Sequence, residues 1–289
     1  MQNLRHTKEE KNNFKRPKRS FFLNIPTKKI LITILSLFII FLVWEKAFEY
    51  FNIPLRIAPK PSNLYQFIYK EFFTQHSSRY QTVFVKSLYS LRDAGIGFVL
   101  SLILGSILGI IISQNNLHNS ILFPFIFLTQ LIPVPALAPI IAVYLGYGAT
   151  TKIFVIILFN IFPITVAVRN TIINLPEYYS LLLYSYTREK KYIFRYLILP
   201  SLVPTLLINM KTLVTASIVA SIITELPLSV KTGIGKDIYN SFNNLLIPRV
   251  WVSIIIISLL SLLFYIAISK FENYINRKYR YGQFQYDNN

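Results

Sequence analysis

Six apolar runs of about twenty residues each constrain this chain more than any other feature. A run of that length spans the roughly 30 Å hydrocarbon core of a bilayer as an α-helix, in which every backbone polar group is bonded within the helix. With 53% hydrophobic residues in 289, a soluble fold is disfavoured. The sequence therefore predicts an all-α, polytopic membrane protein with about six transmembrane helices, at residues 30–48, 94–113, 121–145, 152–168, 201–224 and 250–269.

Basic residues give the chain a net charge of +18 and crowd into segments 5–29, 188–195 and 270–280. Each cluster flanks an apolar run, which is the pattern that the positive-inside rule predicts for cytosolic segments. We therefore expect both termini in the cytosol, the N-terminal tail against anionic membrane lipids, and no nucleic acid partner. The expected divisions are a basic cytosolic tail (1–29), a first transmembrane helix with an external connector (30–80), a transmembrane domain (81–272) and a cytosolic C-terminal tail (273–289).

One polar segment, 177–204, separates two of the apolar runs. Its central charges at 188–191 are excluded from lipid, because each would cost about 2.5–3.5 kcal/mol at the bilayer centre. From residue 192 onward, polar and apolar residues alternate at helical spacing until Leu199-Pro200, which we expect to end the helix. The sequence predicts a solvated, amphipathic cytosolic helix that ends where a span begins.

Three prolines interrupt the predicted span 121–145. Pro133, Pro135 and Pro139 each lack a backbone donor and clash with the preceding turn, so we expect no regular helix through them. At membrane depth such a break is tolerated only where protein or a water-filled cavity satisfies the freed carbonyls. A translocation pathway or gate is therefore expected here, with Gln130 beside it.

The predicted span 201–224 is the most polar of the six. Ser217, Ser221 and Thr224 are spaced i, i+4, i+7 and share one helix face, while Lys211 lies nearer the cytosolic end. Serine and threonine in membrane helices often only bond back to the carbonyl four residues earlier. A polar face should contact protein or water, so lining of a pathway is the second interpretation.

Glu225 closes that span, in a chain that has no carboxylate between Asp93 and Glu177. Two interpretations stay open. Glu225 either caps the glycine-rich external loop at 233–235, or it takes part in solute gating or in docking an external protein.

Small residues recur at every fourth position of the second predicted span: Gly97, Ser101, Gly105, Gly109 and Ser113. This spacing places them on one helix face, where they allow another helix to approach closely. We expect tight helix packing here rather than contact with a solute.

Several kinds of chemistry are missing from the sequence. The stretch 146–152 has glycines and a lysine but not the GxxxxGK[ST] pattern that cradles phosphates, so no ATP site is expected. His6, His76 and His118 are far apart, there is no cysteine, and no buried pair of carboxylates is apparent. We expect no cofactor, no metal and no enzymatic activity, and energy delivered mechanically by a partner through a cytosolic element.

These features resemble the permease subunits of bacterial ABC importers, in the group that transports sulfonates, taurine, nitrate or thiamine pyrimidines. The resemblance covers about residues 59–269. In the family's cytosolic EAA loop, Leu199-Pro200 matches, whereas its Gly falls on Thr187 and its Glu-Ala-Ala on 181–183. Further matches are Ala58-Pro59-Lys60-Pro61-Ser62, Pro135 to Pro139 followed by Gly146, Gly148 and Lys152, Phe162-Pro163, and Glu225 followed by Gly233-Ile234-Gly235.

The resemblance implies an ABC importer permease fold with a cytosolic coupling helix. Two copies would pair in the inner membrane, dock two ATPase subunits, and receive a small solute from an external substrate-binding protein. The solute stays open among sulfonates, nitrate, thiamine pyrimidine and riboflavin. The coupling residues expected are Glu177, Thr187, Arg188, Glu189, Lys190, Lys191, Arg195, Leu199 and Pro200, and those of the pathway or gate are Gln130, Pro133, Pro135, Pro139, Lys211, Ser217, Ser221, Thr224 and Glu225.

The alternative is a stand-alone secondary transporter. Such carriers show inverted repeats and an ionisable site inside the membrane. Neither feature is evident in the sequence.

Overall fold

The computed structural model describes residues 27–70, 82–187, 189–226 and 232–279, and these residues form helices and no strand. The all-α prediction is confirmed. The chain divides into two units, 1–53 and 54–289. The first contains α1 (Thr27–Tyr50), and the second contains α2 (Pro61–Tyr69), α3 (Val83–Ser113), α4 (Asn116–Leu131), η3 (Val134–Leu137), α5 (Ala138–Leu145), α6 (Ala149–Ile173), α7 (Glu177–Tyr186), α8 (Lys190–Ile193), η4 (Phe194–Ile198), α9 (Leu199–Glu225), α10 (Ile234–Asn243) and α11 (Ile247–Tyr279).

Among the described residues, five helical stretches are long and apolar enough to cross a membrane. The sixth predicted span is the interrupted segment from α4 to α5, in which α4 contributes a shorter apolar helix. The long stretches are Leu31–Tyr50, Val83–Ser113, Ala149–Ile173, Lys190–Glu225 and Ile247–Lys278.

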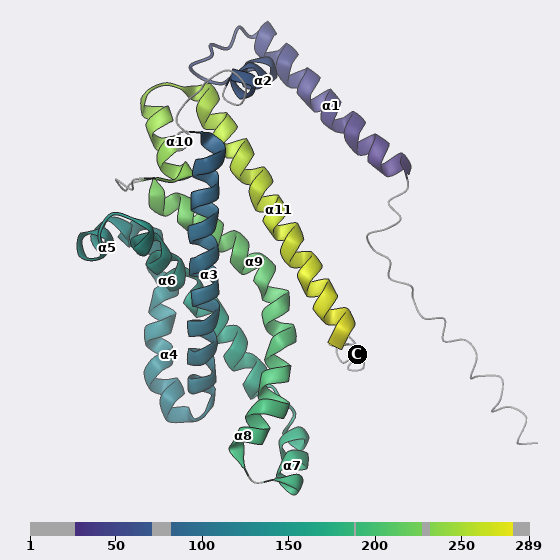
Figure 1. Ribbon diagram of the computed structural model, residues 1–289, viewed down its shortest axis with the longest axis vertical. Coiled ribbons are helices and arrows are strands. Elements are labelled where there is room, and N and C mark those ends of the chain that lie inside the picture. The colour runs from purple at the N-terminus through teal and green to yellow at the C-terminus, as the bar shows by residue number, and fades with distance from the viewer. Residues whose placement is uncertain (1–26, 71–81, 188, 227–231, 280–289) are drawn as a thin grey trace, which may run out of the picture. The chain divides into compact units, whose positions relative to one another are not determined.

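Helices α3, α6 and α9 form the core of the second unit, and α11 packs along α3 and α9 (Figure 1). The closest packing is between α3 and α6, because α3 presents glycine where α6 presents branched side chains. A Cβ added at Gly97 or Gly105 would lie 2.7 Å from Ile156 or Ile164, respectively. The small-residue face therefore serves helix packing, as predicted.

The proline-rich segment breaks the helix as predicted, although not at every proline. α4 ends at Leu131, and the backbone at Ile132 is extended, the conformation favoured before a proline. Pro139 is different, because it lies in the first turn of α5, where a missing N–H leaves no hydrogen bond unmade. No regular helix runs through the three prolines, as predicted, and Pro139 instead begins a new helix.

The polar segment is organised differently from the prediction. It forms two helices rather than one, because the backbone is extended at Thr187, after α7. The second helix does not end at Leu199-Pro200 but continues through η4 into α9. There the amide of Leu199 donates to the carbonyl of Phe194, five residues back, which makes a π-helical turn. The wider turn accommodates Pro200, which lacks an N–H and crowds the preceding turn of a regular helix.

Candidate functional site

Helices α7 and α8 lie together at one end of the bundle, opposite α10 (Figure 1). The described residues of α7, α8 and η4, here called the 177–198 segment, bury no side chain. Leu181 and Leu182 in α7 are 60% and 57% exposed, and Tyr186 is 82% exposed. Apolar side chains gathered on one exposed element are typical of a surface that contacts another protein or the membrane.

Charged and aromatic side chains on the second half of this segment interact mainly with one another. Glu189 and Lys191 form a 2.7 Å ion pair in which both side chains are exposed. The ring of Tyr192 stacks on that of Tyr196 at 6.1 Å, and the Arg195 guanidinium lies 6.0 Å from the centre of the Tyr196 ring. Exposed pairs of this kind contribute about 0–1 kcal/mol to stability, so a partner can replace them at little cost. Arg188 lies outside the described residues.

The structure separates the residues expected to line a pathway into two groups. Gln130, Pro133 and Pro139 are exposed around the break between α4 and α5. The second group is the polar face of α9, which is buried and is described next.

The serine and threonine face of α9 points into the bundle of its own chain. Ser217 accepts a 2.7 Å hydrogen bond from the Asn160 side chain of α6, and Ser221 donates to the carbonyl of Ser90 in α3. Thr224 donates to the carbonyl of Ala220, the local bond that serine and threonine commonly make in membrane helices. Within one copy of the chain, these hydroxyls face protein and not an open surface.

Beside this polar face, three helices meet at a buried ion network. The Lys152 ammonium of α6 pairs with Asp93 of α3 and lies 3.0 Å from Glu225 Oε1 of α9. The side chains of all three residues are at most 2% exposed. The expectation that the chain has no buried pair of carboxylates is therefore wrong. The two carboxylates are far apart in the sequence, and only the fold brings them to one lysine.

Glu225 also fixes the start of α10. Its Oε2 accepts a 2.7 Å hydrogen bond from the Gly235 amide, and its Oε1 accepts one of 2.7 Å from Ser90. The Ser90 hydroxyl in turn accepts from the Ile234 amide at 2.9 Å. A Cβ at Gly233 would lie only 2.4 Å from the Glu225 carboxyl carbon, so the close approach requires glycine there. This geometry agrees with the interpretation of Glu225 as a structural cap of the glycine-rich loop.

A second network ties α10 to its neighbours at the same end of the bundle. Asp237 of α10 pairs with Lys86 of α3, and the Arg249 Nε of α11 lies 3.0 Å from Asp237 Oδ2. Together the two networks connect α3, α6, α9, α10 and α11. In both, the carboxylates are bound by cations or donors of the same chain, and these contacts hold the helices together at this end of the bundle. Among the described residues, no cluster of three or more His, Asp or Glu side chains is arranged to hold a metal ion.

Lys211 has a different environment. It lies on α9 and pairs with Glu272 of α11 at 2.8 Å, and its side chain is 29% exposed. It also lines a groove of about 500 Å³ together with Thr212, Thr215 and Tyr265. The four other lining residues are Phe159, Ile208, Ala216 and Val219.

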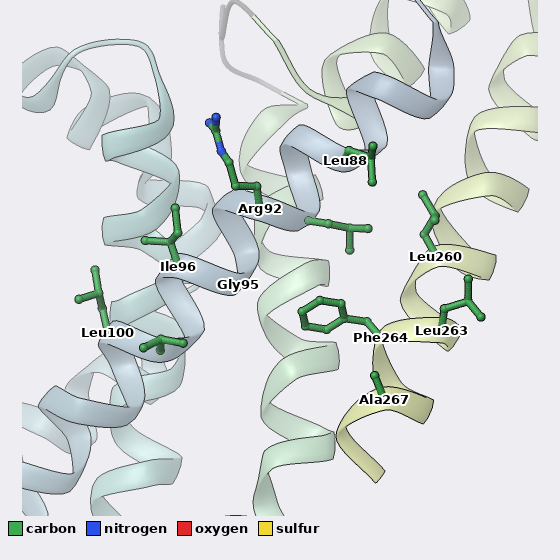
Figure 2. A pocket seen from close by; sticks show the side chains of 11 residues that line it. Leu88, Arg92, Gly95, Ile96, Leu100, Leu260, Leu263, Phe264 and Ala267 are labelled. Carbon is green, nitrogen blue, oxygen red and sulfur yellow. The ribbon is translucent and has the colours of Figure 1, made fainter. Parts of the chain in front are cut away.

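A larger groove of about 770 Å³ runs between α3 and α11 (Figure 2). Leu260, Phe264 and Ala267 line it from α11, and the side chain of Phe264 projects toward α3. The charged end of Arg92 points away from these residues and binds Asp93 at 2.7 Å. The groove is therefore lined mainly by apolar side chains.

Comparison with known proteins identifies the family. Residues 101–281 match the family described as "Binding-protein-dependent transport system inner membrane component". The chain is 31% identical to the formylaminopyrimidine transport permease protein ThiX of Halalkalibacterium halodurans, over 64% of this chain and 73% of that protein. It is 22% identical to a probable ABC transporter permease protein of Haemophilus influenzae, over 83% of this chain and 94% of that protein.

Two further similarities are weaker. The nitrate import permease protein NrtB of Leptolyngbya laminosa is 25% identical over 80% of this chain and 82% of that protein. Among solved structures, a chain of the MetNI methionine ABC transporter in inward-facing conformations aligns with a TM-score of 0.44 and 17% identity, over 64% of this chain and 94% of that chain. This structural similarity is too low to add to the assignment.

The family match covers more than half of the chain, and the first relative named exceeds 30% identity over most of its length. Components of this family lie in the bacterial inner membrane and work with an ATPase subunit and a substrate-binding protein. A stand-alone secondary transporter is not favoured. The chain belongs to the binding-protein-dependent transport system inner membrane components, the permease subunits of ABC transporters, in which ATP hydrolysis is carried out by a separate subunit.

Proposed function

We propose that this chain forms the translocation pathway of an ABC importer as a pair of identical copies. Each copy docks one ATPase subunit on its 177–198 segment in the cytosol and receives a small solute from an external binding protein at the α10 end. Both termini lie in the cytosol, and the exposed apolar faces contact membrane lipids. In this proposal the parts are a basic cytosolic tail (1–29), a first transmembrane helix with an external connector (30–80), the transmembrane domain (81–272) and a C-terminal cytosolic tail (273–289).

The observation that carries the proposal is the continuity of one helical stretch, Lys190–Glu225. It begins in the exposed 177–198 segment, crosses the bundle as α9, and ends at Glu225 in the buried network. A helix is stiff along its axis, so a displacement of its cytosolic end by an ATPase reaches the opposite end of the bundle. Rigid-body and hinge movements of this kind switch a pathway between two states.

The residues that we propose to contact the ATPase lie in the 177–198 segment and at the start of α9. Exposed apolar side chains of α7 provide the contact area, and Glu177, Glu189, Lys190, Lys191 and Arg195 provide charges that can pair with the ATPase. Electrostatic pairs at an interface set orientation and partner choice more than they add affinity. Thr187, Arg188, Leu199 and Pro200 complete the set that we propose for coupling.

The gate of the proposal is the break between α4 and α5, with Gln130, Pro133, Pro135 and Pro139 around it. Residues that interrupt a helix leave carbonyls that water or a solute can reach. The pathway wall on α9 is its exposed face, which includes Lys211. Ser217, Ser221, Thr224 and Glu225 would act behind this wall, as the packed support that keeps α9 against α3 and α6.

Co-purification tests the coupling surface. The tagged chain, expressed with its ATPase and gently extracted, should retain the ATPase in about equal amount. The double variant Leu181→Glu/Leu182→Glu should lose the ATPase, because two exposed contacts become charged. The matched control is Tyr239→Glu/Phe242→Glu on α10, where the side chains are 49% and 60% exposed at the opposite end of the bundle. Equal recovery of the ATPase with both double variants would remove the coupling role of α7.

A further inference from the structure

Among the described residues of the second unit, none covers one face of α9. Ile208 and Val219 are 48% and 45% exposed, and Thr212 and Thr215 between them are exposed too. These positions are spaced so that they share one side of the helix, away from the buried Ser217 and its neighbours. Lys211 borders this face and lines the groove of about 500 Å³ that includes both threonines.

Lys211 lies near the middle of α9, a helix that is long and apolar enough to cross a membrane. An ammonium at that depth is costly in lipid, and such residues as a rule face a water-filled cavity or the interior of a protein assembly. The exposed threonines beside it have the same preference. The open face of α9 therefore suits an aqueous pathway better than it suits lipid.

The bonding of Lys211 leaves part of its ammonium free. An ammonium has three donors. Within the described part of the chain, its one ionic or hydrogen-bond partner is Glu272, at 2.8 Å. Glu272 is 11% exposed and does not line the groove, whereas Lys211 is 29% exposed and does. A solute in the groove meets the ammonium and not the carboxylate behind it.

The rest of the groove fits one kind of solute. The hydroxyl of Thr215 already donates to the carbonyl of Lys211, so its oxygen remains as an acceptor, and Thr212 adds a second hydroxyl. Phe159 and Tyr265 line the groove from α6 and α11. Donors beside aromatic rings match a small, flat molecule with one negatively charged or strongly accepting group.

We propose that Lys211 contacts the transported solute and selects for molecules that carry such a group. Glu272 positions the Lys211 ammonium when the groove is empty. When a solute is bound, its negatively charged or accepting group accepts hydrogen bonds from the two N–H groups of Lys211 that do not bind Glu272. This inference rests on the proposed function, since it requires that the open face of α9 lines the pathway. It extends the proposed function by naming the class of solute and the residue that selects it.

The electrostatic preference of the groove can be measured without knowing the solute, because the chain contains no cysteine. Thr215→Cys is introduced into the transporter assembled with its ATPase and binding protein in vesicles. Its rates of modification by anionic sulfonatoethyl and cationic trimethylammonioethyl methanethiosulfonate are then compared, each normalised to a free thiol. A single charge a few ångströms away in a partly solvated groove should favour the anionic reagent on the order of tenfold.

Variants of the ion pair assign the preference to Lys211. Lys211→Gln should abolish it, and Glu272→Gln should increase it. The charge exchange Lys211→Glu/Glu272→Lys keeps an ion pair between α9 and α11, yet it should favour the cationic reagent. A pair whose ammonium does not reach the groove predicts a ratio unaffected by the exchange. Leu117→Cys, on the exposed start of α4, serves as a control whose ratio should not respond to Lys211→Gln.

Two outcomes would overturn the inference. One is a Thr215→Cys thiol that reacts with neither reagent in any nucleotide state, since the groove would then not face the pathway. The other is a preference that Lys211→Gln leaves unchanged. Both are distinguishable from failure of the proposed function, because the same preparation reports whether the ATPase was recovered with the chain.

Discussion

Two lysines in membrane-spanning helices, Lys152 and Lys211, show how differently the same residue type can be used. Lys152 is 1% exposed and is shared by two carboxylates from two other helices. Lys211 is 29% exposed, pairs with one carboxylate, and borders a groove. A cation saturated by its own chain stabilises the fold, whereas one with donors to spare is available to a ligand. Burial and the number of partners separate the two uses.

The variant Lys152→Met tests this comparison most strongly, because it should have the largest effect on stability. It leaves Glu225 buried without a cation and Asp93 with Arg92 alone, and uncompensated buried charge costs about 3–5 kcal/mol. We expect a large loss of thermal stability for the detergent-solubilised protein, or failure to assemble. The control Lys191→Met, at a side chain that is 71% exposed, should change the free energy of unfolding by less than about 0.5 kcal/mol.

A second variant keeps the test informative if Lys152→Met does not fold. Neutralising the carboxylates as well, with Asp93→Asn and Glu225→Gln, removes the buried charges and should recover part of the stability. Melting of Lys152→Met at the wild-type temperature would mean that the network is not structural, and that the contrast with Lys211 does not hold.

The next effect concerns the α3–α6 packing that brings Lys152 to Asp93. In Gly109→Ala the new Cβ would lie 2.7 Å from the Val168 side chain and 2.8 Å from the backbone oxygen of Thr165, so one helix has to move. Overpacking of this kind costs about 1–3 kcal/mol. Gly95→Ala on the same helix is the matched control, since nothing lies within 4 Å of its Cβ. Thermal unfolding of the two variants should differ, and equal stability would contradict the packing argument.

Much of the fold was predictable because it depends on local sequence. Apolar runs gave the spans, the spacing of Gly97, Gly105 and Gly109 gave the close helix contact, and the proline cluster gave the break after α4. These signals act over one or two helical turns, so one sequence is enough to detect them. The continuous passage from η4 into α9 was missed because a π-helical turn has no simple sequence pattern.

The ion network was not predictable in the same way. Asp93, Lys152 and Glu225 lie on different helices, and nothing in their local sequence indicates that they meet. The only signal was their polarity next to apolar spans, which by itself also fits an exposed boundary residue. The orientation of Ser217 and Ser221 toward the bundle was open for the same reason, because periodicity places residues on one face without saying what that face contacts.

A smaller effect is expected at the second lysine. Replacing both Lys211 and Glu272 by glutamine removes a partly exposed ion pair without leaving a lone charge, so stability should fall by less than about 1 kcal/mol. The measurement is again thermal unfolding, beside Lys152→Met. A loss as large as that of Lys152→Met would mean that the Lys211 pair is structural too, and would erase the difference between the two sites.

The smallest effect on stability is expected for substitutions in the 177–198 segment, although these should reduce ATP-driven transport. Glu189→Leu/Lys191→Leu removes an exposed 2.7 Å pair, so the free energy of unfolding should change by less than about 1 kcal/mol and membrane insertion should persist. ATP-driven transport should fall, because these charges lie where the ATPase is proposed to dock. The appropriate comparison is Lys46→Leu/Glu49→Leu, an exposed pair of 2.9 Å on α1. If transport stays normal in the first variant, the ATPase docks elsewhere, and the exposure of this segment requires another partner.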